Sequence, residues 1–134
     1  MSYFTAMDTE LVERLYGALR SGDAAALAAA LAPDVALHVP GDHHLAGTHR
    51  GPGAVLEFLT ATSGATDGGE RVEVIDVLGG REHVAVYARS RARRSGAVLD
   101  NPTVHLFRVD GGRVAEIWFH NRDQRPVDAF WGAR

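Results

Sequence analysis

The chain contains 134 residues, of which 46% are hydrophobic and 23% are charged, and its formal net charge is −3. A chain of this length buries roughly two-thirds of its unfolded surface, which indicates a single domain, residues 1–134, around one core. The slightly acidic balance argues against nucleic acid as a partner. The sequence has no cysteine, so disulfides and thiolate chemistry are excluded.

The first residues lack the basic, apolar and small-residue segments that make up a signal peptide. No apolar run in the sequence approaches the length that spans a bilayer. We therefore expect a soluble, cytoplasmic protein without a membrane partner.

Three segments in the first half of the chain have the spacing of amphipathic helices. Apolar residues recur at helical intervals over 11–19, and Gly22 is well placed to end that helix. Asp23 can cap a second, alanine-rich helix, which must stop before Pro33. Pro52 suits the first turn of a third helix, whose apolar stripe follows it.

The remaining elements have the two-residue period of strands. Residues 34–39 alternate so that Leu37 and Val39 share one face and His38 lies on the other. From residue 71 onward, Gly-Gly and Ser-Gly pairs separate alternating segments, which predicts an antiparallel meander. Its four strands are 71–80, 82–96, 97–112 and 113–121. Residues 125–132 then predict a terminal helical turn that packs back on the body.

Most predicted helices lie in the first half of the sequence and most predicted strands in the second half, which indicates an α+β fold. We expect three N-terminal helices packed on a strongly curved, mainly antiparallel sheet, as in a conical α+β barrel. A sheet that curls around the first helix would leave a cavity lined by its inner face. Cavities of this kind hold small molecules.

Three segments carry a resemblance to a known family: "YGALRSGDAAALAAALAPDVALHVPG", "LAGTHRGPGAVLEFL" and "VHLFRVDGGRVAEIW". With the order of elements around them, they resemble the nuclear transport factor 2-like superfamily. Within it, the chain is similar to SnoaL-like polyketide cyclases and ketosteroid isomerase-like proteins over nearly its whole length. The resemblance implies the conical fold with a ligand-binding pocket, whereas similarity of fold does not carry a reaction with it.

Ketosteroid isomerases use an aspartate base and an oxyanion hole made by a tyrosine and a protonated aspartic acid. The resemblance places Leu15 at the tyrosine position and His105 at the position of the protonated acid. It places Val39 at the position of the base, although a slip of one residue would place His38 there. Two of the three functional groups are then absent, which argues against steroid isomerisation by that mechanism.

His105 is the polar side chain best placed to face the predicted cavity. Alternation puts it on one strand face with Asn101, Thr103 and Phe107. Imidazole suits proton transfer near neutral pH, while a structural histidine bonded to a neighbour is the other interpretation. The expected substrate-binding residues, several of them placed by the resemblance, are Leu15, Tyr16, Val39, His44, Phe58, Asn101, Thr103, Phe107, Ile117, Phe119 and Trp131.

The segment "HVPGDHHLAGTH", residues 38–49, holds four of the seven histidines. Its spacing does not match the helical or paired-strand arrangements that usually hold zinc, so we expect no metal. We expect it to form the rim of the cavity, where His38, Asp42, His43 and His44 could overhang a ligand. His43 and His49 are expected to be solvated loop residues, and for His38 and Asp42 that alternative stays open.

These features predict a cofactor-independent enzyme that uses general acid–base catalysis on a small, largely apolar substrate. An isomerase, cyclase, hydrolase or dehydratase would suit such a pocket. His105 is the candidate acid or base, His38 or Asp42 its counterpart, and Asn121 the group that orients a water or a carbonyl. The alternatives are a non-catalytic module that binds a metabolite in the same pocket, and a metal-dependent enzyme built on residues 38–49.

The outer face of the sheet predicts a partner of a different kind. By alternation Glu116, Trp118 and His120 lie on the face that turns away from the cavity. A large aromatic side chain on an outer sheet face needs covering, and members of the family that the chain resembles commonly pair through that face. We therefore expect a homodimer.

Overall fold

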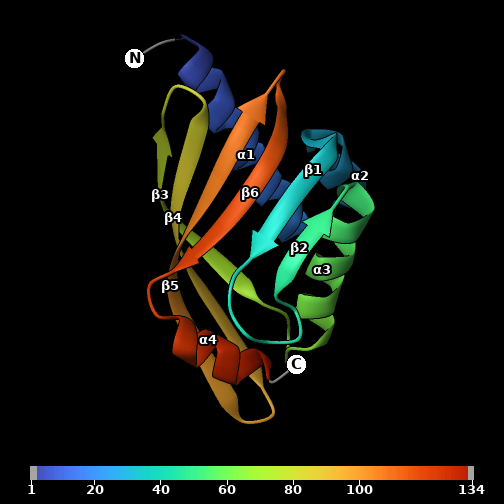
Figure 1. Ribbon diagram of the computed structural model, residues 1–134, viewed down its shortest axis with the longest axis vertical. Coiled ribbons are helices and arrows are strands. Elements are labelled where there is room, and N and C mark those ends of the chain that lie inside the picture. The colour runs from blue at the N-terminus through green and yellow to red at the C-terminus, as the bar shows by residue number, and fades with distance from the viewer. Residues whose placement is uncertain (1–2, 133–134) are drawn as a thin grey trace.

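The structure is a computed structural model that describes residues 3–132, and it has the predicted α+β architecture (Figure 1). The helices are α1 (Tyr3–Ser21), α2 (Ala24–Ala30), α3 (Pro52–Gly64) and α4 (Gln124–Trp131). The strands are β1 (Leu31–Val39), β2 (Gly47–Arg50), β3 (Arg71–Gly79), β4 (His83–Arg94), β5 (Ala97–Asp110) and β6 (Arg113–Asn121).

Within residues 3–132 the six strands form one sheet in the order β2-β1-β6-β5-β4-β3. The antiparallel meander predicted for β3 to β6 is confirmed. β1 pairs with β6 in parallel, so the sheet is mixed. Because β2 and β3 remain as edge strands, the sheet does not close into a complete barrel.

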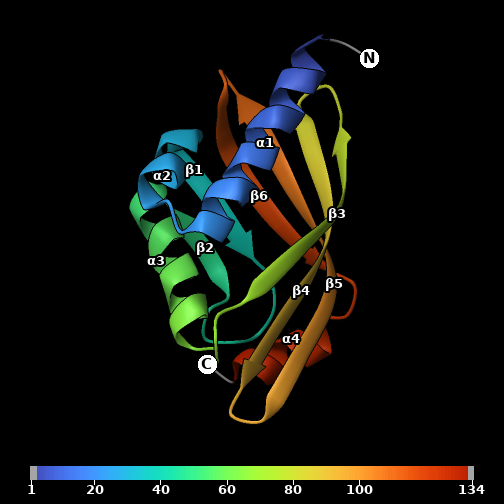
Figure 2. The ribbon, with the colours of Figure 1, turned by 180° about the vertical axis from the view of Figure 1, so that it is seen from behind.

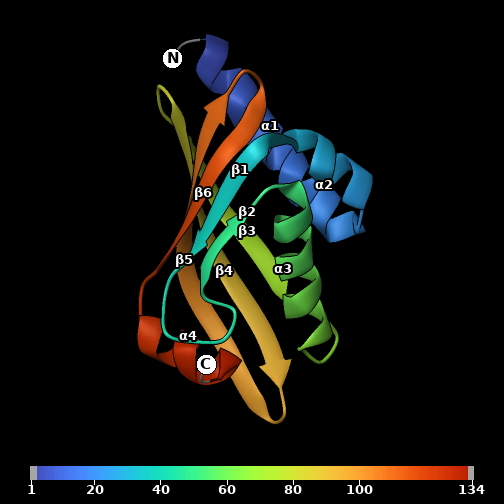
Figure 3. The same cartoon turned by 45° about the vertical axis from the view of Figure 1, so that its right-hand side comes forward.

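Helices α1, α2 and α3 lie on the same side of this sheet, and α1 crosses it diagonally (Figures 2 and 3). α1 buries Val12 and Tyr16 against a core that includes Val84, Val86 and Phe107 from β4 and β5. The helix stripe and the alternating strand faces therefore meet as their periods predict. The described chain has no helix that is both long and apolar enough to cross a bilayer.

Helix α2 shows how local chemistry sets the element boundaries. The side chain of Asp23 accepts a hydrogen bond from the backbone N–H of Ala26 at 3.0 Å, which caps the helix as predicted. The helix ends at Ala30 and β1 begins at Leu31, so Pro33 lies within β1. The β1–β6 register shifts between Leu31 and Ala36, around this proline, which cannot donate a ladder hydrogen bond.

Two segments have more regular structure than the sequence predicts. Residues 47–50 were expected to belong to a loop and instead form β2, which pairs with β1 as an antiparallel edge strand. The terminal turn is an eight-residue helix, α4, and Asp123 caps it by accepting from the N–H of Arg125. α4 lies across the lower end of the sheet, away from the other helices (Figure 1).

The loop after β1 approaches α4 closely at Gly41. The φ angle of Gly41 is +108°, a backbone conformation that favours glycine. A Cβ at this position would collide with the side chains of Gln124 and Asp128. The same two helix residues hold the loop, because Gln124 donates to the carbonyl of Pro40 and Asp128 accepts from the N–H of Asp42.

Candidate functional site

A cavity of about 1090 Å³ lies between the helices and the inner face of the sheet. Its wall is mostly apolar, with contributions from the four helices and from β1, β3, β4, β5 and β6. Three phenylalanines, Phe58, Phe107 and Phe119, are among the lining residues, as are the polar side chains of Tyr16 and His105. An apolar cavity with a few polar groups is the usual form of a small-molecule site.

Tyr16 and His105 form the most direct polar contact inside this cavity. The hydroxyl of Tyr16, on α1, lies 2.6 Å from Nδ1 of His105, on β5. The two rings are parallel to within 1°, and the ring of Phe119 lies 4.2 Å from that of His105. Tyr16 also makes an edge contact with Phe107. Packing on both rings therefore fixes the geometry of the hydrogen bond.

Burial keeps both members of this pair in their neutral forms. Desolvation lowers the pKa of His105 from 6.5 to about 4, because an imidazolium would lose its hydration in the apolar wall. Desolvation likewise raises the pKa of Tyr16 above its ordinary value. At neutral pH the site therefore contains a neutral imidazole bonded to a neutral phenol.

A second polar cluster joins the sheet to α4. Asn101 and Thr103 both donate to Oδ1 of Asn121, each at 2.9 Å, and Asn121 donates in turn to Gln124 at 2.9 Å. Gln124 then donates to Asp128. Asn121 was expected to orient a water or a carbonyl, and in the structure its side-chain oxygen accepts from Asn101 and Thr103.

Most of the expected substrate-binding residues line the cavity. They are Leu15, Tyr16, Val39, Phe58, Asn101, Phe107, Ile117, Phe119 and Trp131, together with His105 and Asn121. Two expected residues lie elsewhere: His44 is exposed on the loop after β1, and Thr103 is buried in the Asn121 cluster. The phenol that the resemblance assigned to the position of Leu15 is supplied by the next residue, Tyr16, whose hydroxyl reaches His105.

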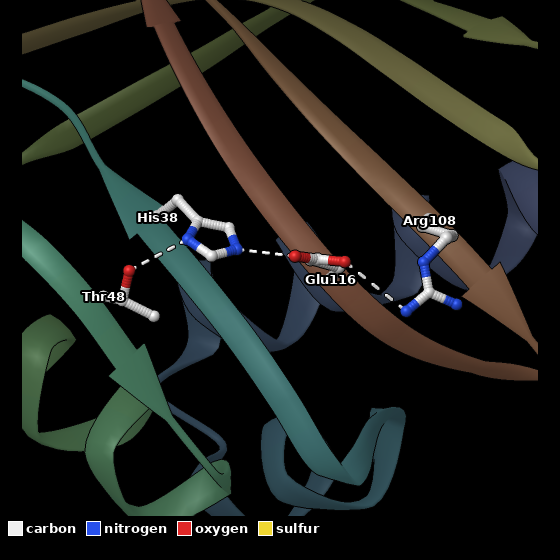
Figure 4. Close-up of polar contacts among 4 residues, drawn as sticks. All are labelled: His38, Thr48, Arg108 and Glu116. Carbon is white, nitrogen blue, oxygen red and sulfur yellow. Dashed lines mark hydrogen bonds and ion pairs between the residues drawn. The ribbon is translucent and has the colours of Figure 1, made fainter.

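His38 and Asp42, the expected counterparts of His105, are not among the residues that line the cavity. His38 alternates with the inward Leu37 and Val39, so its side chain is on the outer face of β1. There its Nε2 donates to Oε2 of Glu116 at 2.6 Å, and its Nδ1 lies 3.0 Å from the hydroxyl of Thr48 (Figure 4). Asp42 is exposed on the loop that α4 holds.

Glu116 is the centre of this outer-face cluster. Its other carboxylate oxygen lies 3.5 Å from a guanidinium nitrogen of Arg108 (Figure 4). The hydrogen bond from His38, reinforced by the charges of His38 and Arg108, holds the pKa of Glu116 below its ordinary value. The ring of His38 also stacks on Trp118 at 5.7 Å. These contacts explain why His38 is a structural residue of the outer face.

The four histidines of residues 38–49 diverge. His38 is on the outer face, His44 is exposed, and the ring of His49 lies 4.9 Å from Phe58. His43 was expected to be solvated but is 1% exposed and lines the cavity, and its Nδ1 accepts from the N–H of Leu45. Among the described residues no group of three or more His, Asp or Glu side chains could hold a metal ion.

One carboxyl group of the cavity was missed at the sequence level. Glu70, just before β3, accepts a hydrogen bond from the hydroxyl of Ser90 at 2.5 Å, and both residues line the cavity. Burial raises the pKa of Glu70, although the hydrogen bond from Ser90 opposes that shift. No local pattern marked this contact, because Glu70 precedes β3 and reaches Ser90 only when β3 pairs with β4.

Comparison with known proteins places the chain in a family. Residues 12–117 match the SnoaL-like domain family. The chain is 40% identical over 126 residues to the uncharacterized protein Rv0034 of Mycobacterium tuberculosis, an alignment that covers 92% of this chain and 95% of that protein. The chain therefore belongs to the SnoaL-like family, and the resemblance seen in its sequence is confirmed.

Solved structures show the same fold. Bal32a, from a soil-derived mobile gene cassette, is similar to this chain with a TM-score of 0.92 and 29% sequence identity, over 96% of this chain and 98% of Bal32a. A nuclear transport factor 2-like protein from Burkholderia xenovorans matches with a TM-score of 0.83 and 22% identity, over 96% of this chain and 98% of that one. The nuclear transport factor 2-like α+β fold is thus shared across this range of identity.

Proposed function

We propose that this protein is a cofactor-independent enzyme that transfers protons on a small, largely apolar substrate held in the cavity. The observation that carries the proposal is the 2.6 Å contact between Tyr16 and His105 in the apolar wall. General acid–base catalysis requires such a group within hydrogen-bond reach of the substrate. The phenylalanines that surround the pair favour an aromatic or alicyclic substrate.

The pair can move a proton without forming a charge. When the Tyr16 hydroxyl donates to Nδ1, the proton of the neutral imidazole is on Nε2, and the phenol oxygen keeps its lone pairs. If Nε2–H gives its proton to the substrate, Nδ1 takes the phenol proton and the phenol oxygen takes one from the substrate. The result is the other neutral tautomer of the same pair. Because burial disfavours the charged forms, this exchange suits the desolvated wall.

A ketone probe tests this activity without knowledge of the natural substrate. We expect the protein to accelerate exchange of the α-protons of 2-tetralone with deuterium from D₂O, followed by proton NMR against buffer alone. Tyr16→Phe and His105→Gln should each lower the protein-dependent rate at least tenfold. The double variant should be little slower than either single one, because residues that act as a unit have non-additive effects.

Two outcomes would contradict this function. One is exchange at the rate of buffer alone under conditions where 2-tetralone binds. The other is an accelerated rate that Tyr16→Phe and His105→Gln leave unchanged. Circular dichroism of each variant, recorded before the assay, checks that lost activity does not reflect lost folding.

A non-catalytic binding module is the second candidate function. The observation that favours it is the Asn101, Thr103 and Asn121 cluster, whose hydrogen bonds are made within the protein. Such a cluster shapes a ligand site without adding a further reactive group to the Tyr16–His105 pair. Mass analysis of a bound ligand after long incubation separates the two functions, since a binding module returns it unchanged.

We also propose that the protein forms a homodimer through the outer face of β5 and β6. On this face Trp118, which is partly exposed, pairs across the ladder with Leu106, and Glu116 and His120 flank it on β6. Such an apolar patch with a polar rim is typical of a self-complementary interface.

Sedimentation velocity tests this assembly. The wild type is expected to sediment as a dimer and Trp118→Glu as a monomer, because a carboxylate buried at the interface would lack a partner. Val98→Glu is the matched control, since Val98 is 68% exposed near the tip of the β4–β5 hairpin. A wild type that is monomeric at micromolar concentration would refute the proposal.

A further inference from the structure

The cavity contains a second polar pair, Glu70 and Ser90, that the proposed proton transfer does not use. Ser90 is 4% exposed and donates to Oε2 of Glu70 at 2.5 Å. β3 pairs with β4 so that Val72 lies opposite Ser90. This pairing brings Glu70, the residue just before β3, to the hydroxyl of Ser90. A carboxyl group in a largely apolar wall is costly unless it has a polar partner. Ser90 is such a partner, so the two residues form a polar pair within this wall.

The two polar pairs lie on the same inner face but apart along the strands. Ser90 on β4 lies opposite Asn101 on β5, and His105 is four residues farther along β5. At a rise of about 3.3 Å per residue, these strand positions are roughly 13 Å apart. Leu99 and Phe107 on β5 also line the cavity, beyond Asn101 and His105 respectively. The wall thus presents polar groups at two points with apolar surface around them.

The chemistry of Glu70 defines the ligand group that it can bind. Burial favours the protonated carboxyl, in which Oε1 can donate while Oε2 accepts from Ser90. In the ionised state the carboxylate only accepts. A hydroxyl group both donates and accepts, so it can pair with Glu70 in either state. Arg20, Arg71, Glu73 and Arg91 also line this cavity and are largely exposed, so they interact with solvent as well.

We propose that Glu70 and Ser90 form a second binding site in the cavity, which takes a hydroxyl group at the far end of an elongated, largely apolar substrate. The site rests on the proposed function, because it presumes that the other end of the same substrate lies at His105. It defines the substrate class as a rod-like or fused-ring compound with an oxygen at each end. Glu70 is thereby a specificity-determining residue.

Two probes that differ by one hydroxyl group test the proposal. They are 4-hydroxybiphenyl, which has one hydroxyl, and 4,4′-dihydroxybiphenyl, which has one at each end. Isothermal titration calorimetry gives the Kd of each probe with the full-length protein. The wild type is expected to bind the dihydroxy probe about tenfold more tightly, the usual size of one additional buried hydrogen bond to an acidic group.

Substitutions then assign this preference to Glu70. Glu70→Met should reduce it to about twofold, the statistical factor for a symmetrical ligand, and leave the Kd of 4-hydroxybiphenyl nearly unchanged. Glu70→Gln, which keeps a donor and an acceptor, should retain most of the preference. Glu57→Met is the matched control, because Glu57 is an exposed residue of α3 outside the cavity, and it should behave as the wild type.

The outcomes separate this site from the proposed function. A preference of about twofold or less in the wild type, or an unchanged preference in Glu70→Met, would overturn the second site and leave the proton-transfer function standing. Failure of the wild type to bind either probe would also overturn the second site, while the exchange assay with 2-tetralone decides the proton-transfer function independently. The wild-type comparison needs no substitution, so it decides the question even if Glu70→Met does not fold.

Discussion

Phe107→Ala is expected to lower the free energy of unfolding by about 3–5 kcal/mol, the usual cost of truncating a buried aromatic residue. Phe107 is 2% exposed on β5, where it packs against the ring of Tyr16. Its neighbours are held by α1 and by the sheet, so they cannot collapse into the space that the ring leaves. Urea denaturation followed by circular dichroism measures the change.

A substitution of similar chemistry at an exposed position provides the control for Phe107→Ala. Leu78, near the end of edge strand β3, is 55% exposed, and Leu78→Ala should change the free energy of unfolding by less than about 0.5 kcal/mol. A loss below about 1 kcal/mol in Phe107→Ala would mean that this part of the wall relaxes freely. In that case the packing that fixes Tyr16 against His105 would also be weaker than the structure indicates.

Acidification is expected to destabilise the protein through His105. The pKa of His105 is about 4 in the folded protein and 6.5 in its ordinary environment, so between these values the unfolded chain binds the proton and the folded protein does not. The stability from burying the neutral imidazole is complete above pH 6.5 and is lost as pH falls toward 4. At 1.36 kcal/mol per pKa unit, the loss is about 3 kcal/mol.

The comparison with His105→Gln isolates this contribution. Glutamine does not titrate, while the carboxyl groups titrate in both proteins, so their effects cancel in the difference between the two stability curves. The free energy of unfolding, measured by urea denaturation at several pH values from 7 to 4, should fall more steeply in the wild type. Parallel curves for the two proteins would show that His105 is hydrated in the folded state.

Most helices and strands of this fold could be predicted from local sequence, because the residues that each one buries recur with the period of a helix or of a strand. The apolar stripe over residues 11–19 and the alternation from Arg71 to Asn121 both mark faces that the structure buries. The pairing of β1 with β6 could not be predicted in this way, since it joins strands that are far apart in the sequence. No local period records which distant strand becomes a neighbour.

The site was predicted less completely, and single residues explain why. Alternation correctly turned His105 toward the cavity, whereas the loose motif that assigned Leu15 could not distinguish it from Tyr16, about 100° further around the helix. The same alternation placed His38 on the other face of the strand from Val39, which faces the cavity. The interpretation of residues 38–49 as a rim loop nevertheless assigned His38 to the cavity. Glu70 becomes visible only when β3 and β4 pair and bring Ser90 to its carboxyl group.

The position of β1 between β2 and β6 also determines when the domain can fold. As the chain leaves the ribosome, β1 emerges well before β6, its parallel neighbour. Contacts between residues so far apart in sequence form slowly, and unpaired strand edges promote aggregation while they persist. Folding during synthesis must therefore wait until β6 is available, and a nascent chain that ends before residue 113 would expose the edge of β1 to chaperones or to other chains.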